Sequence, residues 1–186
     1  ARLTVHVPGG RPPTDRLDAV AREVRLLCRS WDEQLAAALE ASDHLPEGSD
    51  ASAVAARWAA RLPEGYRDAV DVRDATADVA ALEAVRTGRA TADAEGGEVR
   101  VWVGSRRHPD SPERLRLVVD GPLDLSRLLP ALESLGLWVT DQAHWSAGEG
   151  LHLHHVGVWV RAPGAPPLTG PGSDRQDARR VARAVA

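Results

Sequence analysis

The spacing of apolar residues changes once along this chain, and that change limits the folds it can adopt. Up to about residue 86, valine, leucine and tryptophan recur at steps of three and four, the period of an amphipathic helix. From Val99 onward apolar and polar residues alternate, which is typical of a half-buried strand. The stretch 87–97 between them is small and polar and ends in two glycines. We therefore expect an α+β protein with a helical unit first and a sheet-containing unit second.

The helical unit is expected to contain three helices. Each carries one apolar stripe, and Thr14 and Asp71 are suitable N-caps for the first and the third. Pro63 should end the second helix, because proline cannot continue a helix interior. The expected helices cover residues 14–41, 54–62 and 71–86, with a loop over 43–50.

The second unit is expected to be a mainly antiparallel sheet with helices on one face. Its element order is close to the split βαβ pattern, with one extra leading strand. Gly136 marks the end of its first helix, and Asp124 or Ser126 is the expected cap. The expected strands cover residues 99–103, 115–119, 137–145 and 151–160, and the helix covers 125–135.

Composition excludes several functions. No methionine, phenylalanine, isoleucine, lysine or asparagine occurs, which indicates a GC-rich genome, and the missing methionine leads us to expect a piece of a longer chain. The net charge is −4 and all 23 basic residues are arginine, so we expect neither nucleic acid nor a membrane as partner. No run of about 18 apolar residues and no signal peptide is visible, which favours a cytoplasmic protein.

Three segments carry distinctive motifs: residues 29–35 (RSWDEQL), 62–67 (LPEGYR) and 125–139 (LSRLLPALESLGLWV). In order and spacing they resemble the RSWDDxL, FPxxYR and LSDVLPxLExLGLxV segments of the very large bacterial NAD-dependent glutamate dehydrogenases. Leucine replaces phenylalanine in the second segment. The resemblance spans about residues 1–160.

This resemblance implies a place in the N-terminal, non-catalytic region of such an enzyme, where ACT-like domains precede the dehydrogenase domain. The parent enzyme would convert L-glutamate to 2-oxoglutarate and ammonia with NAD, in amino-acid catabolism. The segment itself would serve regulation and oligomerisation, with the remaining domains and other subunits as partners. The implied parts are a strand of a preceding ACT-like domain (1–10), a helical connector (11–97), an ACT-like domain (98–162), and a Pro/Gly linker with a basic helix (163–186).

We expect no catalytic, cofactor-binding or metal site within the chain. The dehydrogenase reaction needs catalytic lysines and a glycine-rich turn for NAD, and the chain has neither lysine nor a G-x-G-x-x-G motif. Two family segments are also altered: DERPY is reduced to DQAH at 141–144, and WIHDF is only weakly similar to LHLHHV at 151–156. No site residue is carried over through these segments.

Histidines and the single cysteine are the other chemically active candidates. His152, His154 and His155 are the candidate metal ligands. His152 and His154 point to one face of a strand and could share an ion, and His144 on the neighbouring strand could approach them. We expect instead that they are solvated on the outer face of the sheet. Cys28 lies in the apolar stripe of a helix, where cysteine behaves as a small core residue.

Three tryptophans suggest an interface. Trp102, Trp138 and Trp159 are out of phase with the apolar residues of their strands, so we expect them on the opposite face of the sheet. An apolar second face needs a cover, which predicts an interface with another domain or subunit.

The turn before the second unit's helix is a candidate effector site. ACT-like domains resemble one another in binding small effectors, often amino acids, near this position. Gly121 would let a ligand approach the backbone beside Asp120, and the helix start at Ser126 offers N–H groups to a carboxylate. An ordinary tight turn is the favoured alternative. Three functions therefore remain open: a scaffold, which we favour, an amino-acid sensor, and a free-standing binding module unrelated to glutamate metabolism.

Overall fold

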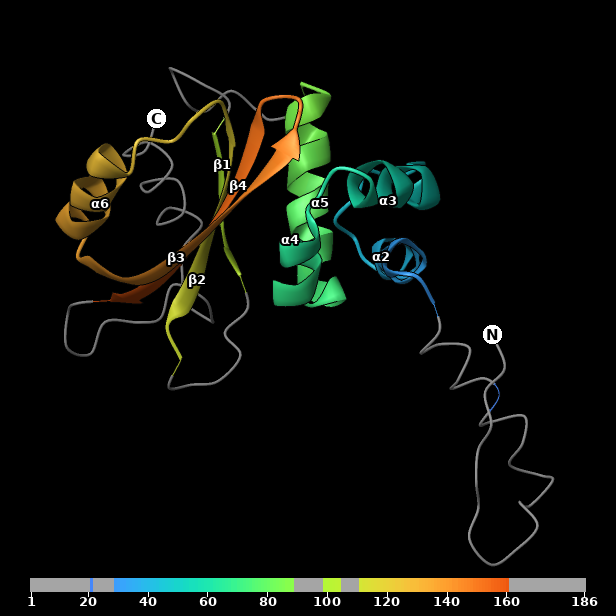
Figure 1. Cartoon of the computed structure of the whole chain (residues 1–186), viewed down its shortest axis with the longest axis horizontal. Helices are drawn as coiled ribbons and strands as arrows, with labels where there is room; N and C mark the ends of the chain where they lie inside the picture. Colours follow the sequence, from blue (N-terminus) through green and yellow to red (C-terminus); the bar gives the residue numbers. More distant parts are fainter. Residues whose placement is uncertain (1–20, 22–28, 89–98, 105–110, 161–186) are drawn as a thin grey trace, which may run out of the picture.

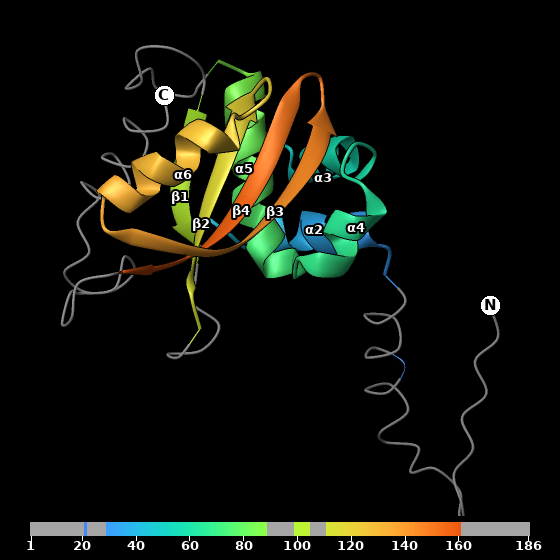
Figure 2. The same cartoon turned by 60° about the vertical axis from the view of Figure 1, so that its left-hand side comes forward.

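A computed structural model describes residue 21 and residues 29–88, 99–104 and 111–160. The predictions for residues 3–7, Cys28 and residues 163–186 lie outside these described residues. In the described part, one sheet lies between a group of helices on one side and a single helix on the other (Figure 1 and Figure 2). The α+β class predicted from the sequence is confirmed.

The helical unit forms as the apolar stripes predict, with aspartate caps at two helix starts. Asp50 accepts a hydrogen bond from the backbone N–H of Ala53, and Asp71 accepts one from that of Arg73. Such caps satisfy N–H groups that have no partner within the helix. The helices are α2 (Trp31–Glu40), α3 (Ala51–Ala59), α4 (Glu64–Ala69) and α5 (Val72–Arg86).

Two details of the helical unit differ from the sequence prediction. One continuous helix over 14–41 is wrong, because Ser30 is extended (ψ 159°) and forms a capping box with Glu33 that starts α2 at Trp31. The short helix α4 was not expected. From the sequence, Pro63 is expected only to end the preceding helix. In the structure it occupies the N-cap of α4, where its missing N–H costs nothing.

The sheet consists of β1 (Val99–Gly104), β2 (Glu113–Asp120), β3 (Leu137–Gly148) and β4 (Leu151–Val160), and α6 (Leu125–Ser134) follows β2. The strand order is β1-β2-β4-β3, and every neighbouring pair is antiparallel. Because β2 and β3 both pair with β4, they run parallel to each other and α6 joins them. This is a split βαβ unit, and β1 is the extra leading strand at its edge.

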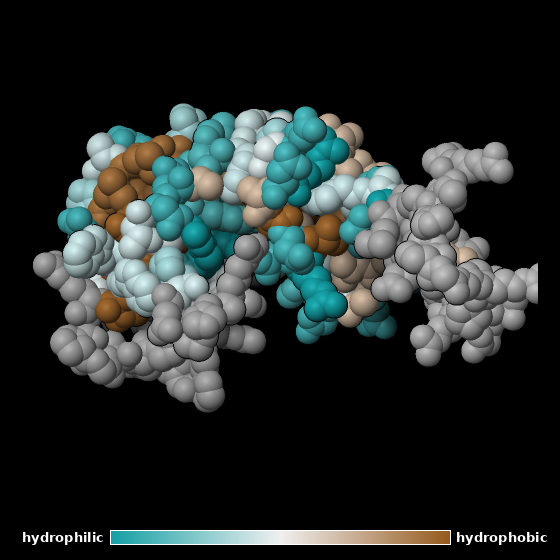
Figure 3. Space-filling view, turned by 60° about the horizontal axis from the view of Figure 1, so that its bottom comes forward, coloured by the Kyte–Doolittle hydropathy of each residue, from teal (hydrophilic) through white to brown (hydrophobic). Residues whose placement is uncertain are grey.

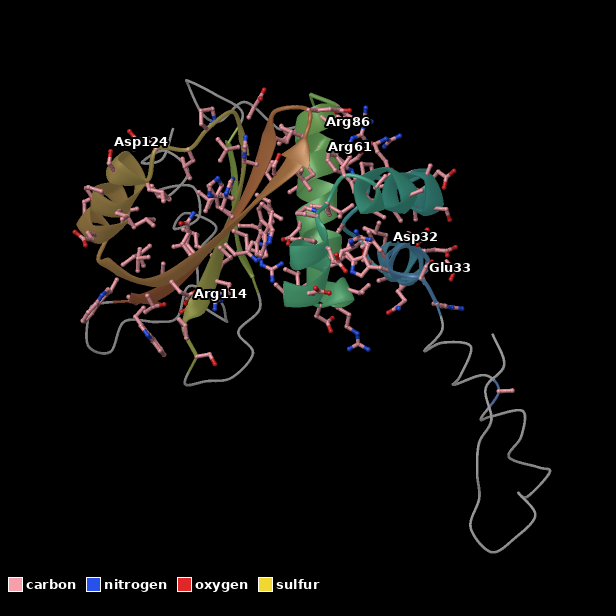
Figure 4. All side chains as sticks on the ribbon, viewed as in Figure 1. Asp32, Glu33, Arg61, Arg86, Arg114 and Asp124 are labelled. Atoms are coloured by element: carbon pink, nitrogen blue, oxygen red, sulfur yellow. The ribbon has the colours of Figure 1, made fainter. Side chains whose placement is uncertain are left out.

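The turn between β3 and β4 connects the sheet to the helical unit. Glu149 and Gly150 have φ values of 55° and 79°, the left-handed pair that matches the twist of a two-residue hairpin. Glu149 forms an ion pair with Arg61, just after α3. Figure 4 shows Arg61 and Arg86 beside this hairpin end.

The two faces of the sheet belong to two apolar cores. Val118 and Leu153 pack with the helical unit, and α5 contacts β1 and β2. On the opposite face, Leu128 and Leu132 of α6 pack on Leu117. The expectation that helices cover only one face is therefore wrong, because the N-terminal helices cover the second one. No helix among the described residues is both long enough and apolar enough to cross a membrane.

Candidate functional site between helices and sheet

A buried carboxylate lies at the centre of the helix–sheet interface. Asp78 of α5 has an exposure of 0%. Its Oδ2 accepts hydrogen bonds from the Tyr66 hydroxyl at 2.7 Å and from Nε2 of His155 at 2.9 Å, and its Oδ1 accepts one from Nη1 of Arg116 at 2.8 Å. We call these four residues the Asp78 cluster. A buried charge is very costly unless it is paired and hydrogen-bonded, so the three partners are what allows Asp78 to stay inside.

Each partner comes from a different element. Tyr66 is the one residue buried by α4, and Arg116 and His155 are directly opposite each other on β2 and β4. Both sheet residues point to the face that the helical unit covers. The Asp78 cluster thus joins two helices to two central strands through polar contacts within an otherwise apolar interface.

The electrostatics of the Asp78 cluster favour ionised Asp78 and Arg116. Burial by itself would raise the pKa of Asp78, but its bonds with His155, Arg116 and Tyr66 outweigh burial and hold this pKa below its usual value. Burial likewise works against the charge of Arg116, and Asp78 and Asp74 reverse that effect and raise its pKa. Burial and the nearby Asp78 carboxylate raise the pKa of Tyr66, which stays protonated as a donor.

Arg116 is held in one position from several sides. Its side chain is 4% exposed, Nη1 also donates to the backbone oxygen of Asp74 at 2.8 Å, and Nη2 lies 3.3 Å from the Asp74 carboxylate. Gly104 of β1 lies against it, since a Cβ added there would come within 2.6 Å of Nε. An arginine that is fixed in this way holds β1, β2 and α5 in position relative to one another.

A cleft of about 320 Å³ opens beside the Asp78 cluster, at the end of the molecule where β2 and α5 begin. We call it the interlayer cleft. Its helical wall includes Val70 and Asp74, and its sheet wall includes Arg114 and Asp141, which form an ion pair at the rim. Figure 4 places Arg114 at this end of β2, and Figure 3 shows hydrophilic residues over the middle of the same end of the molecule.

An aromatic ring lines the interlayer cleft. Trp145 of β3 packs edge-on against Tyr66 and His155, with ring centroids 5.2 Å and 5.0 Å away. Edge-to-face contacts of this kind fix ring orientation. The cleft therefore combines an apolar wall, charged groups of both signs and a floor that the Asp78 cluster holds rigid.

A larger cleft, of about 550 Å³, lies between the α2–α3 loop and the end of α5. Its central carboxylate, Glu83, accepts hydrogen bonds from Arg57, Arg86 and Trp58 at 2.7–3.1 Å. These contacts lie within the helical unit and join α3 to α5, so we assign this cluster to helix packing.

The predicted effector residues lie at and beyond the C-terminal end of β2, whereas the interlayer cleft lies at its start. Asp120 and Ser126 are exposed, and Gly121 has φ 90°, as a tight turn requires. Asp124, labelled at the start of α6 in Figure 4, already accepts hydrogen bonds from the backbone N–H and the hydroxyl of Ser126. The backbone N–H of Ser126 is therefore already paired with Asp124. The effector site stays a prediction.

The predicted interface tryptophans share one face of the sheet, but their surroundings differ. Trp138 and Trp159 are directly opposite each other on β3 and β4, with exposures of 66% and 37%. Trp102 is half-buried against the helical unit of the same chain. The chain thus covers Trp102 itself, and the exposed pair remains as the predicted interface.

The expectation of solvated strand histidines is wrong for two of them. His152 and His154 do point to the same face, beside His144, but His154 is 4% exposed and His155 is 6% exposed. Nε2 of His144 lies 3.0 Å from Nδ1 of His152. Among the described residues, no group of three or more histidine, cysteine, aspartate or glutamate side chains is placed to hold a metal ion.

The Asp78 cluster is the part that sequence reasoning missed. Asp78 lies three residues after Ala75 and four before Leu82, and both of these are fully buried. An aspartate in phase with an apolar stripe signals a buried carboxylate that needs partners. The signal is present in the sequence, but it does not identify the partners Arg116 and His155, which come from two strands of the sheet.

Comparison with known proteins gives one match, which falls on the helical unit. Residues 44–85 match the family model of the glutamate dehydrogenase helical motif 2. The match covers α3, α4 and nearly all of α5, including Tyr66 and Asp78. No curated protein and no solved structure matches significantly. Residues 44–85 are therefore a region related to glutamate dehydrogenases.

Proposed function

We infer that this chain is a non-catalytic structural segment of a large NAD-dependent glutamate dehydrogenase. In the parent enzyme, L-glutamate would be oxidised to 2-oxoglutarate and ammonia elsewhere, and this segment would hold neighbouring domains and subunits in position. The match of residues 44–85 to a glutamate dehydrogenase helical motif supports the family, and the packing of that motif supports the scaffold role.

The main support for the scaffold role is the burial of Asp78 and the set of contacts that it makes. This carboxylate belongs to the matched helical motif and lies 0% exposed, with all its contacts directed at Tyr66, Arg116 and His155. A catalytic carboxylate needs access to a reacting group. One that is enclosed by three partners from other elements stabilises the packing of helices on the sheet instead.

The split βαβ unit supports an ACT-like assignment for the second half of the chain. Its strand order β2-β4-β3 with α6 on one face fits that domain type, while the helical unit occupies the other face. The exposed Trp138 and Trp159 provide a surface for a neighbouring domain or subunit. We place the assembled enzyme in the cytoplasm.

The test compares the chain alone with the complete protein that contains it. The complete protein should reduce NAD when L-glutamate is added, and the purified chain should neither do so nor bind NAD in calorimetry. In the complete protein, Asp78→Asn should lower the fraction of assembled enzyme while the KM for glutamate stays unchanged. Asp68→Asn is the matched control, because Asp68 is exposed on α4.

Two results would contradict the proposed function. NAD binding by the chain alone would show that it contains part of the cofactor-binding site. A complete protein without glutamate-dependent NAD reduction would remove the family assignment.

A further inference from the structure

We propose that the interlayer cleft binds a small zwitterion, a molecule that carries a carboxylate and an ammonium group a few ångströms apart, such as a free amino acid. This inference goes beyond the scaffold role and does not depend on it. It rests on the charges, the apolar wall and the free hydrogen-bonding atom that meet in the cleft.

Charges of both signs line the cleft. Arg114 and Arg116 are on β2, while Asp74 is on α5 and Asp141 is on β3. An anion alone would leave the carboxylates facing it, and a cation alone would leave the arginines facing it. A ligand with both charges offers a partner to groups of both signs at once.

The rim pair can exchange partners with such a ligand. Arg114 and Asp141 are paired with each other, and their side chains are 38% and 46% exposed. Exposed ion pairs contribute only about 0–1 kcal/mol, so opening this one costs little. The ligand carboxylate would then bind Arg114, and its ammonium group would bind Asp141. Arg116 stays fixed by Asp78 and Asp74 and takes no part in this exchange.

His155 gives the floor of the cleft a second acceptor for the ammonium group. Its Nε2 donates to the Asp78 carboxylate, so in the neutral ring Nδ1 is the acceptor. Nδ1 has no hydrogen-bond partner among the described residues. The Asp78 cluster thus fixes the tautomer that suits an ammonium donor.

The size and the apolar wall define the remainder of the ligand. Small-molecule sites start at about 300 Å³, so a cleft of about 320 Å³ suits a small ligand. Val70 and the ring of Trp145 add apolar surface to the lining of the cleft. An amino acid with a compact apolar side chain, such as L-valine, satisfies all of these groups.

The test is a thermal-shift scan of the purified chain with the free amino acids, followed by calorimetry. At least one amino acid should raise the melting temperature in a dose-dependent way at millimolar concentrations, because a ligand that binds only the folded state stabilises it. For L-valine, isovalerate lacks the ammonium group and isobutylamine lacks the carboxylate, and neither analogue should bind.

Variants then locate the site. Arg114→Gln and Asp141→Asn should each raise the dissociation constant at least about tenfold. Arg67→Gln, on an exposed position of α4, should leave it unchanged. A scan without any shift, equal binding of the single-charge analogues, or unchanged affinity in Arg114→Gln would overturn the proposal. Loss of binding in Gly121→Val alone would move the site to the turn before α6 and would overturn it as well. None of these results alters the test of the scaffold role.

Discussion

Nε2 of His155 lies 2.9 Å from Oδ2 of Asp78, although the two residues are 77 positions apart in the sequence. One belongs to the last described strand and the other to the glutamate dehydrogenase-related helical motif. Their contact shows that the helical unit and the sheet share one interior.

Asp78→Asn should destabilise the chain by about 3–5 kcal/mol, because it removes the nearer and fully buried of the two carboxylates that pair with buried Arg116. Urea denaturation followed by circular dichroism measures this change. Asp68→Asn, on an exposed position of α4, should change stability by no more than about 0.5 kcal/mol. Equal stability of the two variants would show that the Asp78 cluster contributes nothing to the fold.

His154 should make the protein acid-sensitive. Burial, together with His144, His152 and His155, lowers the pKa of His154 from 6.5 to about 4. Since the folded-state pKa lies below the unfolded value, the unfolded chain binds an extra proton between these two pH values. Stability should therefore be complete above pH 6.5 and fall as the pH drops toward 4, by on the order of 3 kcal/mol.

Urea unfolding at a series of pH values checks this dependence. His154→Gln should flatten the curve by up to one proton, whereas His44→Gln, in the exposed α2–α3 loop, should not. A curve that keeps its full slope in His154→Gln would assign the acid sensitivity to another group.

Local signals in the sequence were sufficient to predict most of the helices and strands. The cap at Asp71 and the stop at Gly136 each depend on neighbours within a few residues, and the structure confirms both. The alternation over residues 115–119 correctly predicts a strand, but a half-buried strand is wrong, because the helical unit also buries Arg116 and Val118 on the second face. Ser30 and Glu33 form a capping box that is also local, and it was overlooked because the apolar stripe continues through it.

The candidate site could not be predicted in the same way. Asp78 meets Arg116 and His155 only after β2 and β4 have paired and α5 has packed on them. No rule about residue spacing along the sequence predicts which residues of β2 and β4 will meet α5. For the same reason, the sequence indicated that Trp102 lies on the second face of the sheet but not that α5 covers this face.

Leu132→Ala should cost about 2–5 kcal/mol, because Leu132 is 0% exposed between α6 and the sheet and its removal leaves a cavity. Leu129 on the same helix is 39% exposed, so Leu129→Ala is the matched control with a loss near zero. Denaturant titration of both variants measures the difference. Similar losses in the two would mean that α6 packs on the sheet through another face.

Trp138→Glu should abolish association through the exposed tryptophan pair. Trp138 is 66% exposed beside Trp159, and large aromatic side chains in such positions supply most of the binding energy at interfaces. A carboxylate buried in that contact would be unpaired and costly. The wild-type chain should therefore associate with itself, or with the remaining domains of its parent, as concentration rises, and Trp138→Glu should stay monomeric in light scattering.

Leu129→Glu is the matched control, because Leu129 is an exposed apolar residue on the α6 side of the sheet. It should associate like the wild type, and Trp138→Glu should keep the wild-type melting temperature, since its side chain contributes little to the core. Association that survives in Trp138→Glu, or a wild-type chain that remains monomeric and does not bind its parent, would exclude the pair as an interface.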